Sequence, residues 1–148
     1  MNLQDDIVYK AFNACYEAGI NNPEGFIISK LPQVFNYLKG CFPRGILPTD
    51  IDGVVEVNRN YLWLEFKTQN QLRNGAIPRG QMMCMTRLSQ NPTFTVFLIG
   101  TDTQGDPTCM EIINPNGKRL PLEDVDGRDG LREKCKQWST WAEKGKRQ

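Results

Sequence analysis

The chain has 148 residues, which is enough for one ordinary domain with a single packed core. Its 18 Lys and Arg residues nearly balance 17 Asp and Glu residues, and hydrophobic residues make up 39%, which excludes wholesale disorder and a collagen-like repeat. Histidine is absent, so Ser-His-Asp and Cys-His nucleophile pairs, Cys2His2 fingers and histidine general bases are excluded. Any catalysis therefore has to use carboxylates, lysine, tyrosine, cysteine or a metal held by oxygen.

The five cysteines are scattered singly along the chain, and no Cys-x-x-Cys pair is present for zinc, iron-sulfur or redox chemistry. The N-terminal residues lack the basic and apolar regions of a secretory leader. The longest apolar stretch, residues 94–100, is far too short to span a bilayer. These features predict a cytoplasmic protein with free thiols and no membrane segment.

Two helices are predicted near the N-terminus. Apolar residues recur at helical spacing over residues 3–18, and Gly19 is typical of a C-terminal cap. Residues 21–25 form a loop, and residues 26–38 are apolar enough for a second helix that Pro32 breaks or begins.

From residue 51 the hydrophobic period changes to two, which predicts a β-hairpin around the turn at residues 58–60. The elements expected after it are a helix at 80–90, a strand at 94–99, a second hairpin with strands 110–113 and 118–122, and a helix at 128–144. This order predicts an α/β (α+β) fold with a central mixed sheet flanked by helices, in a single domain over residues 1–148.

The first hairpin gathers ionisable residues. With a tight loop at residues 59–60, Asp52 lies opposite Lys67, and Val54 lies opposite Glu65 on one face of the sheet. The other face then carries the apolar residues, and we expect Ile51, Val55, Leu64 and Phe66 to be buried there. A slip of one residue would invert every side chain, so burial of this apolar set favours the stated register.

Two carboxylates held close together repel each other unless a cation joins them. Hard oxygen ligands with room for water suit Mg²⁺ or Mn²⁺. A metal held by Asp52 and Glu65 would polarise a phosphoryl oxygen, while Lys67 could position or deprotonate the attacking water. The pattern therefore indicates phosphodiester hydrolysis without histidine.

At these residues the sequence resembles the PD-(D/E)XK nuclease superfamily, which places an acidic residue at one strand and Glu/Asp-x-Lys on the next. Asp52 matches the first position and Glu65-Phe66-Lys67 the second, and Gln81 opens a helix before a further strand as in many members. The resemblance covers residues 46–100 and implies metal coordination by Asp52, Glu65 and the Phe66 carbonyl, with Lys67 at the nucleophilic water. It implies a deoxyribonuclease acting on duplex or branched DNA.

Further candidates have plainer alternatives. Asp50 is either an additional metal ligand or a residue that forms the turn before the strand. Glu17 is either an acidic ligand from the first helix or a solvated helix residue. Gln81 either orients a phosphate or a metal-bound water or simply belongs to the first turn of its helix. Basic residues near the proposed site are candidates for phosphate contacts: Arg59, Arg73, Arg79 and Arg87.

Two other interpretations remain open. Trp138 and Trp141 share a helical face with Leu131 and Cys135, which favours core packing over stacking on bases. The carboxylate–lysine pattern could also be an exposed ion pair on a non-catalytic nucleic-acid- or protein-binding module that retains the nuclease fold. A small basic surface on one protomer would favour a homodimer for gripping a duplex.

Overall fold

The structure is a computed structural model that describes residues 3–145 and divides into two compact units, Met1–Asp50 and Ile51–Gln148. None of the helices within the described range combines the length and the apolar character needed to cross a bilayer.

The first unit is helical, and its elements are α1 (Leu3–Glu17), α2 (Pro23–Lys30) and three short 3₁₀ turns, η1 (Leu31–Gln33), η2 (Phe35–Leu38) and η3 (Pro43–Gly45). The side chain of Asn22 caps α2 by accepting the Gly25 N–H at 3.0 Å, and Pro23 occupies the first turn, where its missing N–H costs nothing. The helix predicted over 26–38 thus begins earlier and ends at Lys30. Pro32 cannot continue an α-helix, and the chain proceeds in 3₁₀ turns.

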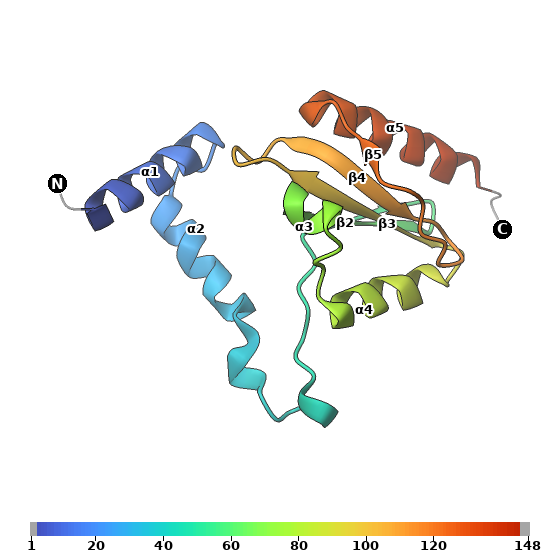
Figure 1. The fold of residues 1–148 in the computed structure, drawn as a ribbon, viewed down its shortest axis with the longest axis horizontal. Coiled ribbons are helices and arrows are strands. Elements are labelled where there is room, and N and C mark those ends of the chain that lie inside the picture. The colour runs from blue at the N-terminus through green and yellow to red at the C-terminus, as the bar shows by residue number, and fades with distance from the viewer. Residues whose placement is uncertain (1–2, 146–148) are drawn as a thin grey trace. The chain divides into compact units, whose positions relative to one another are not determined.

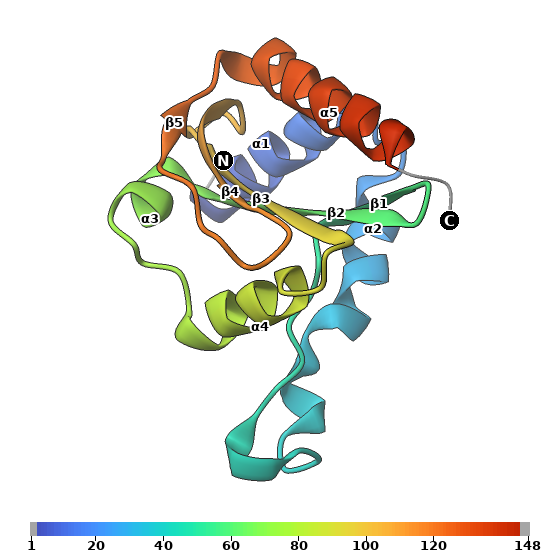
Figure 2. The same ribbon diagram turned by 90° about the vertical axis from the view of Figure 1, so that its right-hand side faces the viewer.

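The second unit is a mixed five-stranded sheet with helices on both faces, which confirms the predicted α/β class. The strands are β1 (Gly53–Val57), β2 (Asn60–Thr68), β3 (Phe94–Thr101), β4 (Pro107–Ile113) and β5 (Glu123–Asp124), in the spatial order β1-β2-β3-β4-β5. Only β2 and β3 pair in parallel, through a crossover that contains α3 (Gln69–Arg73) and α4 (Arg79–Ser89). Figures 1 and 2 show α4 on one face of the sheet and α5 (Gly127–Lys144) on the other.

Each face of the sheet has its own core, because alternate residues of the central strands point to opposite sides. Leu62, Phe97 and Met110 pack with Trp138 and Ala142 of α5. On the opposite face, the α3 and α4 side has a separate buried cluster: Trp63, Leu72, Met85, Val96, Leu98, Cys109 and Ile113. The side chains of Trp63, Glu65 and Lys67 therefore belong to the α4 face.

The register of the first hairpin differs from the prediction by two residues. Val57 pairs with Asn60 and Val55 with Leu62, so the two-residue turn is Asn58-Arg59, not Arg59-Asn60. Both turn residues have positive φ, as this tight hairpin turn requires. Asp52 is therefore not opposite Lys67; if the pairing is continued by one residue beyond Gly53, Asp52 lies opposite Glu65. A shift of two residues preserves the predicted faces.

The predicted burial of the apolar hairpin residues is wrong for three of four. Ile51, Val55 and Phe66 are exposed, whereas Leu64 packs against the α5-side core. The reason is that β1 is the edge strand of the sheet. Its turn end reaches α5, where the Asn58 side chain donates to the carbonyl of Ala142 at 3.2 Å.

The second predicted hairpin is also wrong, since residues 118–122 form no strand. After the turn, the chain makes one bridge to β4, between Ile113 and Arg119, and the paired strand is the later β5. Two turn amides are used elsewhere: the N–H groups of Asn116 and Gly117 both donate to the carbonyl of Ser89 at the end of α4. The turn is thereby fixed to the helix, and it does not continue into a second ladder.

Candidate carboxylate and lysine site

Glu65 is the centre of a buried polar network. Its side chain is 2% exposed, and it accepts hydrogen bonds from Trp63 Nε1 at 3.1 Å and from Gln81 Nε2 at 2.5 Å. The Lys67 ammonium lies 2.9 Å from Glu65 Oε1 and is itself mostly buried. A buried carboxylate is stable only with such partners, and these three donors provide them.

Local sequence explains this convergence. Trp63, Glu65 and Lys67 alternate along β2 and so share one face of the sheet. Gln81 stands in the first turn of α4, which packs over that face, and its side chain is buried there. The strand and the crossover helix thus bring three of the predicted residues, Glu65, Lys67 and Gln81, together with Trp63.

Asp52 lies beside this network, at the start of the hairpin. Its Oδ2 accepts the backbone N–H of Phe66 at 2.7 Å, which fixes the carboxylate next to the Glu65-Phe66-Lys67 segment. Within a strand, the N–H and C=O of one residue point to the same side. The Phe66 carbonyl therefore faces the same side as Asp52, at the position where β1 has not yet begun.

The donor set fits a hard divalent cation that keeps most of its water. A carboxylate has about four acceptor positions, of which Glu65 uses three and Asp52 uses one among the contacts of the described residues. Mg²⁺ commonly binds through only one or two carboxylates and water. Across residues 3–145, no group of three or more His, Cys, Asp or Glu side chains is arranged to hold a metal, so this pair would have to act with Phe66 and water.

The other predicted residues lie in different settings. Asp50 is exposed at the end of the first unit, and Glu17 is the last residue of α1 in that same unit. Asp50 does not appear among the partners of Glu65 or Lys67. Their predicted roles as ligands stay predictions.

The four arginines are all exposed, but they are not equivalent. Arg79 is the first residue of α4, two positions before Gln81, and Arg87 is in the last turn of that helix. Arg73 pairs with Asp124 at 3.2 Å. Arg59 is in the hairpin turn, which is six residues, or about 20 Å, along β2 from Glu65.

Sequence reasoning missed two contributors to the site. Trp63 was not among the predicted site residues, although its parity with Glu65 along the strand is the signal that the indole N–H can reach the carboxylate. Helix α3 was also missed, yet Thr68 and Gln71 have the spacing of a capping box. The Gln71 N–H donates to Thr68 Oγ1 at 3.2 Å, and the Thr68 N–H donates back to Gln71 Oε1 at 3.1 Å. This cap ends β2 directly after Lys67.

Comparison of the chain with protein-family models, with curated proteins and with solved structures gave no match.

Proposed function

We propose that this protein is a metal-dependent nuclease that hydrolyses phosphodiester bonds in DNA. The observation that carries the proposal is the contact between the Lys67 ammonium and the Glu65 carboxylate, which lie 2.9 Å apart on one strand. Asp52 lies beside this pair and accepts the backbone N–H of Phe66. This is the arrangement that the resemblance to PD-(D/E)XK nucleases implies for a pair of ligands and a lysine at the attacking water.

Each residue of the site has a separate role in the proposed reaction. Asp52, Glu65 and the Phe66 carbonyl would hold Mg²⁺ or Mn²⁺, which when bound polarises a phosphoryl oxygen and lowers the pKa of a water. The Gln81 amide holds Glu65 in one orientation, and the Phe66 N–H does the same for Asp52. The Lys67 ammonium would orient the attacking water and offset the negative charge that develops on phosphate. No step requires an imidazole.

The preferred substrate is DNA with a duplex or branched structure. Arg79 and Arg87 present exposed guanidinium groups on the helix that also supplies Gln81, and they suit phosphates on either side of a scissile bond. Because the formal net charge is only +1, one copy would grip a duplex weakly. A homodimer would double the contact surface, and we include it in the proposal.

The test is cleavage of linear, nicked and four-way-junction DNA with Mg²⁺, Mn²⁺ or EDTA. We expect metal-dependent cleavage that is lost in Lys67→Ala and in Asp52→Asn. Lys136→Ala is the matched control, because that lysine is exposed and pairs with Glu133 on α5. Equal cleavage by the wild type and Lys67→Ala would refute the role of the lysine, and cleavage that persists in EDTA would refute the role of the metal.

A second function is favoured by one observation: donors within the chain already use three of about four acceptor positions of Glu65. A carboxylate held by Trp63, Gln81 and Lys67 is consistent with a structural network in a binding module as well as with a catalytic site that has no metal bound. The module would bind nucleic acid or protein without chemistry. DNA binding that persists with no cleavage of any DNA or RNA substrate in either metal would support this function over the nuclease.

A further inference from the structure

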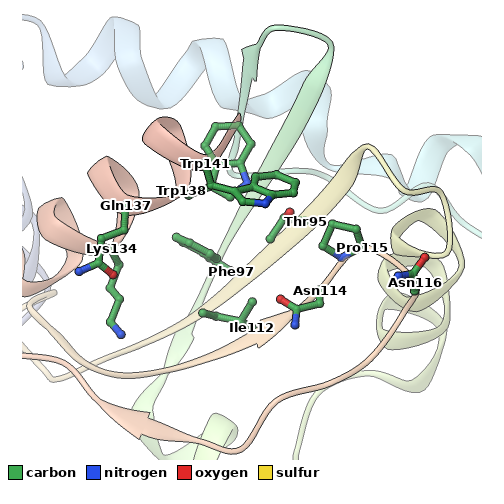
Figure 3. A pocket seen from close by; sticks show the side chains of 10 residues that line it. All are labelled: Thr95, Phe97, Ile112, Asn114, Pro115, Asn116, Lys134, Gln137, Trp138 and Trp141. Atoms are coloured by element: carbon green, nitrogen blue, oxygen red, sulfur yellow. The ribbon is translucent and has the colours of Figure 1, made fainter. Parts of the chain in front are cut away.

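A cavity lies on the face of the sheet opposite Glu65, between α5 and strands β3 and β4. Its volume is about 440 Å³, which is in the range of sites for small ligands. Phe97 and Ile112 form its sheet side, and Trp138 and Trp141 contribute indole rings from α5. Figure 3 shows the two indoles at the end near Thr95, with Asn114 and Pro115 on one side of the cavity and Lys134 and Gln137 on the other.

One wall of this cavity contains an unpaired donor. Trp138 is 7% exposed, and its Nε1–H is, among residues 3–145, the only buried side-chain N or O atom without a hydrogen-bond partner. A buried polar group without a partner costs free energy, and its presence needs an explanation. Trp138 also lines the adjacent cavity, and an acceptor from outside the chain that entered there would supply the missing partner once the indole ring turned, since the nitrogen itself has almost no accessible surface.

A second indole in the same wall is available for stacking. Trp141 is 49% exposed, whereas Trp138 and Ala142 of the same helix are buried in the core. The sequence favoured core packing for both tryptophans, and the structure confirms it for Trp138 only. An aromatic ring that is open to solvent at the edge of a cavity is the usual platform for a planar ligand.

The polar groups around the rings indicate a neutral, planar ligand with donors and acceptors on its edge. The side-chain amides of Asn114 and Gln137 line the cavity, and they form no hydrogen bond with other described residues. The Lys134 ammonium is 3.0 Å from the Glu123 carboxylate, so the charge on that side is already balanced. Amides beside an aromatic ring are how proteins recognise unpaired nucleobases.

We propose that this cavity binds the base of an unpaired nucleotide, stacked on Trp141 and hydrogen-bonded by the amides of Asn114 and Gln137, with a base carbonyl as the acceptor for Trp138. This site goes beyond the proposed nuclease function and involves none of its residues. Trp63 and Glu65 lie on the other face of the sheet, and base binding requires no metal.

The test uses the three indole N–H signals of the ¹⁵N-labelled full chain, in EDTA, during titration with each of the four deoxynucleoside monophosphates. We expect the signals of Trp138 and Trp141 to shift together and to saturate for at least one base. The Trp63 signal should stay in place, because that indole is bonded to Glu65 on the opposite face. The corresponding nucleoside should bind similarly, since the ligand is the base.

Variants of the cavity residues test whether the base stacks on Trp141 and bonds to Asn114. Trp141→Leu should weaken binding at least about fivefold, the loss expected for one stacked base, whereas Trp141→Phe should retain most of it. Asn114→Leu should weaken binding and change the preference among bases. The unshifted Trp63 signal shows that each variant is folded.

Three results would overturn the proposal: no saturable shift with any nucleotide, equal binding by Trp141→Leu, or equal shifts with N-acetyltryptophanamide. The last would indicate a general aromatic cavity and not a base site. Because every measurement is made without divalent metal, an inactive catalytic site would not affect the result, and failure here would leave the nuclease proposal intact.

Discussion

Replacing Lys67 with methionine would leave a buried carboxylate without its cation. Glu65 is 2% exposed, and its three donors are Lys67, Gln81 and Trp63, of which only the first carries charge. Removing one partner of a buried ion pair costs about 3–5 kcal/mol. Because two neutral donors remain on Glu65, we expect the lower end, about 3 kcal/mol, for Lys67→Met.

A double-mutant cycle separates the pair from its surroundings. In Glu65→Gln the lysine loses its partner, but its ammonium can turn toward solvent, and we expect a cost of about 1–2 kcal/mol. The double variant removes both charges, so its cost should be lower than the sum of the two single costs by about 2 kcal/mol. Such a coupling energy would place the pair among buried interactions and not among surface ones.

The assay is urea unfolding followed by tryptophan fluorescence. All three tryptophans lie in Ile51–Gln148, so the signal reports on that unit alone. With a slope of about 2 kcal/mol per M, a loss of 3 kcal/mol lowers the midpoint by about 1.5 M. Lys136→Met, which breaks an exposed pair with Glu133, should leave the midpoint unchanged. A loss below about 1 kcal/mol for Lys67→Met, with no coupling, would refute the burial argument.

The remaining predictions address the metal, a second ion pair and a partly buried thiol. Mn²⁺ should broaden the indole N–H signal of Trp63, which is bonded to the proposed ligand carboxylate, before the signals of the other two tryptophans; uniform broadening would contradict the site. The partner of the buried Glu111 is Arg119, whose pKa is raised mainly by their hydrogen bond. Because the guanidinium is about half exposed and solvent screens it, Arg119→Met should cost only about 1 kcal/mol in urea unfolding, and an unchanged midpoint would refute this. Burial raises the pKa of the Cys135 thiol, so iodoacetamide should modify this thiol more slowly at pH 8 than the exposed Cys41, and equal rates would contradict the burial. The free energy of unfolding should also fall as the pH rises above about 8.5, because the thiol of the unfolded chain loses its proton at a lower pH than the thiol of the folded chain.

Much of the fold follows from local pattern. The 3.6-residue period predicted α1, α4 and α5, the two-residue period predicted β1 and β2, and a short apolar run predicted β3. Of these elements, α4 and α5 each bury one face against the sheet, whereas α1 has no buried residue and β1 is mostly exposed. The parity of Trp63, Glu65 and Lys67 along β2 likewise brought the polar residues of the candidate site to one side. These predictions needed no information from distant parts of the chain.

The errors arise where distant contacts decide. The hairpin turn is Asn58-Arg59 because three contacts act together: Glu56 accepts the Arg59 N–H, and the amides of Asn58 and Asn60 bind the carbonyl of Ala142. A sequence window around the hairpin does not contain Ala142. The exposure of β1 has the same origin, since its position at the sheet edge depends on the order of all five strands.

The contact between the hairpin turn and the end of α5 has a consequence for folding. Asn58 bonds to the carbonyls of Ala142 and Gly145, residues that are 84 and 87 positions later in the sequence. The first strands of this unit therefore cannot complete their turn contacts until its last helix has docked. Contacts between residues so far apart in sequence form slowly, and during synthesis the hairpin turn would have to wait for the final turn of α5 to leave the ribosome.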